Sequence, residues 1–223
     1  MRRFHRCAFA LWSLAICTAW AADDYYAGGI AAIATLSADG RSLTSSNASQ
    51  VSLYKPDNGA AVNVFFGRYI GNYVSLQGNY MWNSNALTFT STDVLPQGTS
   101  FYQENRSSSQ SSIIGDVLVF FRDRTSLLRP YLSAGTGLVH LESSQGNIDA
   151  VYGSPVLPPR NFSANTAGLR VAVGIDVRLR HGFALRYSFS ETISSNPISH
   201  QISPPGERPL KNFQNLVGFV KNF

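Results

Sequence analysis

Apolar and polar residues alternate with a period of two along several segments of this chain. The clearest example is the sequence GLRVAVGIDVRL, which begins at Gly168. One set of alternate positions is apolar and the other is small or charged: Leu169, Val171, Val173, Ile175, Val177 and Leu179 against Gly168, Arg170, Ala172, Gly174, Asp176 and Arg178. Successive side chains of a β-strand point to opposite faces, so this pattern predicts a strand with one apolar face.

Seven further segments are predicted to be strands on the same grounds. They cover residues 25–36, 61–67, 73–82, 112–121, 131–141, 183–190 and 212–223. The first and fifth of these are rich in Ala and Gly, which leaves open which of their residues share a face. Together the eight segments predict an all-β fold.

The links between the segments alternate between short and long. Short links are expected near Gly71-Asn72, at 122–126 and at 180–182, where hairpin turns fit. The long links are rich in Ser, Asn, Gly and Pro, and they cover 37–58, 83–110, 142–165 and 194–211. Short periplasmic turns and long extracellular loops are typical of bacterial outer-membrane barrels. The sequence therefore predicts an eight-stranded antiparallel up-and-down transmembrane β-barrel.

The N-terminus has the composition of a secretory signal. Three arginines precede an apolar stretch, and Ala19-Trp20-Ala21 offers a cleavage site. We expect cleavage after Ala21, which leaves residues 22–223 as the barrel. A retained anchor and lipid attachment at Cys17 are the alternatives.

Cleavage changes how the charge and the cysteines are interpreted. Three of the 18 Lys and Arg lie in the signal, so 15 remain against 13 Asp and Glu. The basic balance is therefore no argument for a nucleic-acid partner. Both cysteines, Cys7 and Cys17, also lie in the signal. The mature chain is expected to have no disulfide, and we expect no metal site and no cofactor.

An apolar face toward lipid puts the other face inside the barrel. The predicted lumen then holds Asp116, Arg170, Asp176, Arg178 and Arg186, along with Asn63, Gln77 and Asn79. The interior of an eight-stranded barrel is just wide enough for side chains to fill it, and buried charges need partners. We expect a network of ion pairs that plugs the lumen, with one arginine in excess. A narrow channel for ions or small solutes is the alternative.

Two short motifs resemble those of known outer-membrane proteins. The last residues, FQNLVGFVKNF, resemble the C-terminal assembly signature of that class, with matches at Phe223, Phe219 and Val217 and a departure at Lys221. The sequence RPYLSAGTG from Arg129 is similar to a strand of small barrels such as the OmpA transmembrane domain and OmpX. The resemblance implies a monomer in contact with outer-membrane lipid, inserted by the barrel assembly machinery.

Two further classes of protein compete with this interpretation. A lipid-modifying enzyme would need a nucleophile and a base, and Ser111, Ser109, His140 and Glu142 are weak candidates at the outer end of neighbouring strands. A soluble lipocalin-like binding protein would turn the apolar face inward. Its usual Gly-x-Trp opening is missing, and the polar face is rich in small residues that suit a crowded lumen. We expect no enzyme, and a structural or surface-interaction role such as adhesion through the loops.

Overall fold

The structure of the chain is a computed structural model. It describes residues 24–37, 42–43, 50–95, 98–155, 157, 159–195 and 210–223. The predicted signal and its cleavage site lie outside the described residues.

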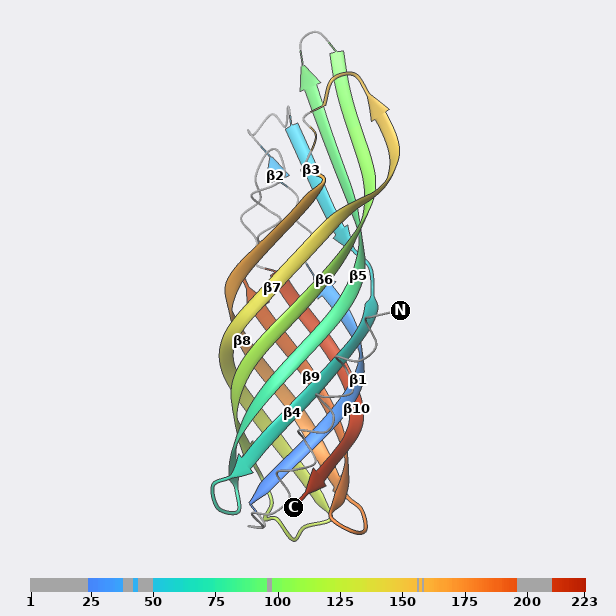
Figure 1. Cartoon of the computed structure of the whole chain (residues 1–223). Coiled ribbons are helices and arrows are strands. Elements are labelled where there is room, and N and C mark those ends of the chain that lie inside the picture. Colours follow the sequence, from blue (N-terminus) through green and yellow to red (C-terminus); the bar gives the residue numbers. More distant parts are fainter. Residues whose placement is uncertain are drawn as a thin grey trace, which may run out of the picture.

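The chain forms one antiparallel sheet in which eight strands close into a ring (Figure 1). Each strand of the ring pairs with its neighbours in sequence, and the first pairs with the last, β1 with β10. The strands are β1 (Tyr25–Ser37), β4 (Gly59–Tyr69), β5 (Val74–Leu95), β6 (Gly98–Phe120), β7 (Leu128–Tyr152), β8 (Asn161–Arg178), β9 (Phe183–Ser194) and β10 (Leu210–Asn222). This confirms the predicted eight-stranded antiparallel barrel. No helix in the described residues is long and apolar enough to cross a membrane.

The apolar face of the strands points outward. In β8, Leu169, Val171 and Val173 are 52%, 42% and 49% exposed, whereas Arg170 and Asp176 between them are buried. Strand β4 repeats this alternation over its whole length. An apolar outside and a polar inside suit a barrel surrounded by lipid. A soluble barrel with an apolar interior would have the opposite arrangement.

Short turns join the strands at one end of the barrel, as the sequence predicts. The turn between β8 and β9 places His181 and Gly182 at φ values of 58° and 74°. Two central residues with positive φ are typical of a type I′ turn, whose twist matches that of the flanking strands. In the turn between β6 and β7, hydrogen bonds from Thr125 and Ser126 hold the pKa of Asp123 below its ordinary value.

Both chain ends of the barrel lie at this same end. The amide of Tyr69, beside the β4–β5 turn, donates to the carbonyl of Asp24 over 2.7 Å. The amide of Phe223 donates to the carbonyl of Tyr25 over 3.0 Å. The turns and both ends therefore form the periplasmic side in the topology of this class of barrel.

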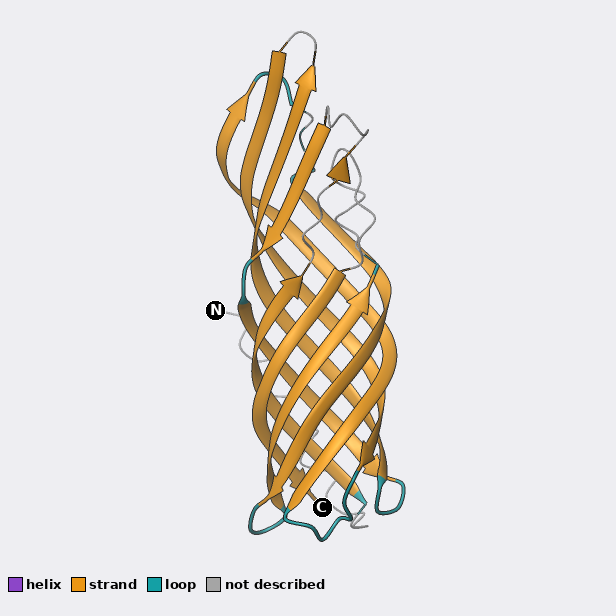
Figure 2. Cartoon of the chain, turned by 180° about the vertical axis from the view of Figure 1, so that it is seen from behind, coloured by secondary structure: helices purple, strands orange, loops and turns teal. Residues whose placement is uncertain are grey.

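The opposite end departs from the prediction, because two of the expected long loops are largely strand. Strands β5 and β6 stay paired from Val74 and Val119 up to Leu95 and Gly98. Strand β7 continues to Tyr152, within the link expected at 142–165. The sheet thus extends well beyond the closed ring (Figure 2).

Two short strands widen this extension. Strand β3 (Gln50–Pro56) pairs with the upper part of β5, and β2 (Ser42–Leu43) pairs with β3. Both lie in the link expected at 37–58. The link at 194–211 falls mostly outside the described residues. Above the lipid the outer face of a strand meets water in place of hydrocarbon, so the apolar alternation that marks the lower strands disappears.

A charge placed on the lipid side tests this orientation. We expect Val173→Arg, midway along the part of β8 that pairs with β9, to lower the free energy of unfolding by about 2–4 kcal/mol, because it lies at mid-bilayer depth. Val177→Arg on the same face, next to the periplasmic turn, is the matched control and should cost no more than about 1 kcal/mol. Unfolding by guanidinium chloride in lipid vesicles measures both. Equal small losses would contradict a lipid-facing β8.

Candidate functional site

Aromatic rings fill the periplasmic half of the lumen. Their centroids lie between 4.7 and 6.2 Å apart in a chain of contacts formed by Phe65, Tyr26, Tyr69, Phe120 and Tyr131. Glycines on the lumen side make room for two of these rings. A Cβ on Gly67 would overlap the ring of Tyr26, and a Cβ on Gly174 would overlap that of Tyr131. The small residues of the polar face are therefore part of a packed interior.

Arg186 of β9 is the centre of the lumen and is only 1% exposed. Its Nε donates to Oδ1 of Asp176 over 2.6 Å and its Nη2 to Oδ2 over 2.7 Å, which is the bidentate geometry of a strong ion pair. Its Nη1 donates to Gln77 over 2.8 Å. The guanidinium also lies 4.9 Å from the ring centroids of both Phe65 and Tyr131. These contacts replace the water that burial removes from the charge.

A second buried ion pair, between Asp116 of β6 and Arg170 of β8, joins the first through amides. Gln77 donates to Asn79 over 2.7 Å, and Asn79 donates to Asp116 over 3.1 Å. The cavity at this level measures only about 10 Å³. That volume is about what one water molecule needs, so side chains close the lumen here.

The structure brings four of the five predicted lumen residues into these two pairs, namely Asp116, Arg170, Asp176 and Arg186. Arg178 is a correction. It is the last residue of β8, where the strand passes into the turn, and its side chain is exposed at the periplasmic mouth. The centre of the lumen therefore holds two arginines and two aspartates, without the excess arginine that the sequence suggested.

Arg129, near the start of β7, is a buried cation that the sequence analysis missed. Its guanidinium lies 3.9 Å from the ring centroid of Phe120 and 5.1 Å from that of Tyr69. It donates to the hydroxyl of Tyr69 and to the carbonyl of Asn72, each over 3.2 Å. It has the same strand parity as Tyr131, which could have indicated its inward direction.

A third buried ion pair lies in the extracellular extension of the sheet. Arg106 pairs with Glu104, and both side chains are almost fully buried. Arg106 also donates to the carbonyls of Pro159 and Arg160, each over 3.0 Å, which holds the link between β7 and β8 against the sheet. Tyr102 donates to Glu104 over 2.6 Å. These residues fall in a link that the sequence analysis expected to be a loop, so they were not considered.

The weak catalytic candidates do come together on the outer face. The register of β6 and β7 places Ser111 opposite His140 and Ser109 opposite Glu142. The imidazole lies between two acceptors: Nε2 is 3.0 Å from Glu142 and Nδ1 is 2.7 Å from Oδ1 of Asn165. Within the described residues, neither serine hydroxyl makes a hydrogen bond to His140. The hydrogen bond between nucleophile and base that serine catalysis uses is therefore not formed in this structure. We refer to Ser109, Ser111, His140 and Glu142 as the polar rim.

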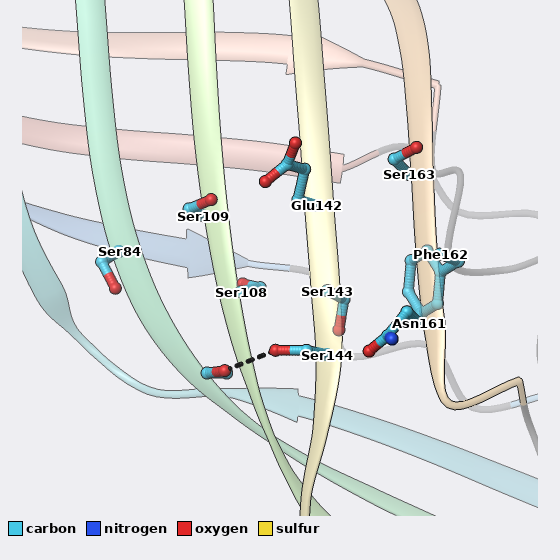
Figure 3. Close-up of a pocket in the computed structure, with 10 residues that line it drawn as sticks. Ser84, Ser108, Ser109, Glu142, Ser143, Ser144, Asn161, Phe162 and Ser163 are labelled. Atoms are coloured by element: carbon cyan, nitrogen blue, oxygen red, sulfur yellow. Dashed lines mark hydrogen bonds between the residues drawn. The ribbon is translucent and has the colours of Figure 1, made fainter.

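Beside this rim, a shallow groove of about 500 Å³ crosses the outside of β5 to β8 (Figure 3). Seven of its ten lining residues are serines, and Glu142 is its charged residue. Five of these serines are not buried: Ser84, Ser107, Ser109, Ser144 and Ser163. Ser107 and Ser144 share a hydrogen bond of 2.9 Å across β6 and β7. Within the described residues, no group of His, Cys, Asp and Glu side chains could hold a metal ion.

The C-terminal strand presents the residues of the predicted assembly signature outward. Val217, Phe219 and Phe223 are 51%, 58% and 46% exposed on β10 and just after it. Their recognition by the assembly machinery stays a prediction.

A closed ring with an apolar outer surface and paired charges inside defines the class of outer-membrane β-barrels. The family model "Outer membrane protein beta-barrel domain" matches residues 7–217. The chain belongs to this family, which implies the bacterial outer membrane as its location. The resemblance to small barrels of this membrane is thereby confirmed.

Solved structures agree on the fold. Neisserial surface protein A (NspA) superimposes with a TM-score of 0.53 at 16% identity, over 89% of this chain and 97% of that one. Ail, the attachment invasion locus protein of Yersinia pestis, superimposes with a TM-score of 0.50 at 11% identity, over 90% and 99%. No curated protein sequence matches the chain.

Removing one partner of the central ion pair should be costly. We expect Arg186→Met to lower the free energy of unfolding by about 3–5 kcal/mol, because Asp176 would stay buried without a counter-charge. Lys211→Met is the matched control, since its pair with Glu191 spans 3.4 Å and is part-exposed, and it should cost about 1 kcal/mol or less. Denaturant unfolding in vesicles measures both. A cost near that of the control would show that the pair does not hold the lumen together.

Proposed function

We propose that this protein is a non-catalytic outer-membrane barrel that presents its extracellular sheet for contact at the cell surface and does not conduct through its lumen. The observation that carries this proposal is the lumen, where two buried ion pairs are joined by Gln77 and Asn79 into one network.

Several layers of side chains support a closed lumen. Below the ion pairs lie the aromatic rings from Phe65 to Tyr131. Above them, Asn212 donates to Asn83 over 2.9 Å and to Gln110 over 3.2 Å. Each layer crosses the lumen from one wall to another, so a solute would have to break all of them in turn.

The shape of the extension supports a role at the surface. Strand β5 has 22 residues and its neighbour β4 has 11, and the extra length lies beyond the ring. From Ser84 to Leu95 the strand rises by roughly 35 Å at ~3.3 Å per residue. The Arg106–Glu104 pair and its contacts stiffen this sheet from inside. A rigid surface held clear of the lipid loses little entropy when it binds a partner.

The groove of serine hydroxyls is the candidate contact surface on this sheet. Hydroxyl groups both donate and accept hydrogen bonds, which suits an uncharged saccharide or another polyol. The Ail structure has also been solved with the heparin analogue sucrose octasulfate. Here the groove carries Glu142 and no cation among its lining residues, so a sulfated ligand is disfavoured.

The proposal includes the route of the protein to the membrane. Residues 1–21 are removed on export, and the barrel assembly machinery reads the strand that ends in Phe223. The barrel stays monomeric with its apolar face against outer-membrane lipid.

Conductance tests the closed lumen. We expect the folded protein in a planar lipid bilayer to give no current steps under conditions in which an open porin does, because the ion pairs and rings fill its lumen. Reproducible current steps that pass through the lumen would contradict this expectation. Ser188→Trp, which places a ring at the level of Arg186, shows whether the steps come from the lumen. If this variant abolishes them, the narrow channel is the better interpretation.

Saccharide binding tests the surface role. The protein in lipid nanodiscs is applied to an array of neutral and sulfated saccharides. We expect binding to neutral saccharides, weakened at least about tenfold by Ser144→Trp, since ten times weaker binding is a loss of about 1.4 kcal/mol. Ile148→Trp adds the same ring to the same strand outside the groove and should leave binding unchanged. No binding, or equal binding by Ser144→Trp, would leave a structural role only.

A further inference from the structure

The periplasmic mouth of the barrel contains a cavity of about 240 Å³ that none of the functions discussed so far uses. Three arginines line it from separate parts of the fold: Arg124 in the turn after β6, Arg129 in β7 and Arg178 at the end of β8. Tyr69 and Phe223 complete much of its wall. Three cations around one small cavity form a strongly positive site.

The surroundings of Arg129 indicate that the cavity binds a ligand. It is 6% exposed, and its Nε is buried without a hydrogen-bond partner. Its other contacts are a hydroxyl, a carbonyl and two aromatic rings, and no carboxylate of the described residues forms an ion pair with it. A buried cation without a counter-charge destabilises a fold unless something else compensates it.

The neighbouring charges do not neutralise the cavity. Asp176 has the acidic side chain of the lining, but both of its oxygens already bind Arg186. Arg124 pairs with Asp24 over 2.7 Å at the part-exposed edge of the mouth. Arg178 is exposed, and its guanidinium makes no ion pair with the described residues. Two of the three arginines are thus left to act on an anion.

We propose that this cavity binds a small oxyanion with the chemistry of phosphate, held by Arg129 and Arg178. A guanidinium offers its N–H groups as a planar fork that matches the oxygens of a phosphate group. Arg129 supplies a fixed donor, because the rings of Phe120 and Tyr69 hold it in place. The anion supplies the counter-charge that the buried Arg129 lacks. The site is independent of the surface role proposed above.

Calorimetric titration of inorganic phosphate into the folded protein in detergent tests the site. We expect binding at one site per chain, weakened at least about tenfold in Arg129→Gln, because glutamine removes the charge and the N–H fork that hold the anion. Arg180→Gln is the matched control, an exposed arginine at the same end of the barrel that does not line the cavity. It should bind phosphate as the unaltered protein does.

A second variant, Arg178→Gln, separates a loss of phosphate binding from a folding defect in Arg129→Gln. Its side chain is exposed, so the variant should fold normally and still lose affinity. Glycerol phosphate distinguishes the source of the anion. Equal binding of glycerol phosphate would indicate a phosphate group carried by a larger molecule, and binding of inorganic phosphate alone would indicate the free anion. No binding by the unaltered protein, or equal binding by Arg129→Gln and the control, would overturn the proposal.

Discussion

The interior of a bilayer offers no hydrogen-bond partner to a peptide group, and the rest of this structure follows from that constraint. The sheet satisfies its own backbone by closing, with β1 against β10 and β5 against β6. Closure fixes which way every side chain points. Residues such as Val171 and Val173 face the lipid, and those between them, such as Arg170, face a narrow interior.

Polar side chains in that interior have no room for bulk water, so they must satisfy one another. The pairs Asp116–Arg170 and Asp176–Arg186 do so with the help of two amides. The same network that makes burial tolerable also fills the lumen, so the surface role and the anion site that we propose lie at opposite ends of the barrel. One end presents a stiff hydroxyl-rich sheet, and the other presents an electropositive mouth around Arg129.

The period-two pattern predicted the strands, their order and four charged residues of the lumen, because parity alone decides whether Asp176 and Arg186 face the lumen or the lipid. It did not predict which of these residues form pairs. It was wrong about Arg178, since the alternation rule ends where the strand does. It also missed the upper halves of β5 and β6. In that region Thr88, Thr90 and Thr92 of β5 share one face and are β-branched, as strand residues often are. They are not apolar, because that face does not contact lipid, so the pattern that marks the lower strands is missing there. The cavity around Arg129 depends on which turns meet in space, which a linear pattern does not encode.

The central claim is that the apolar face of each strand contacts lipid and the polar face lines the interior. The cysteines of the chain, Cys7 and Cys17, both lie in the predicted signal, so single cysteines can be introduced along β8 and spin-labelled in lipid vesicles. Labels at 169, 171, 173 and 175 should be accessible to oxygen, which dissolves in lipid, and not to a water-soluble nickel chelate. Labels at 170, 172, 174 and 176 should be shielded from both. The reverse parity, with the even positions open to the chelate and the odd ones shielded, would contradict a membrane barrel and indicate a soluble one.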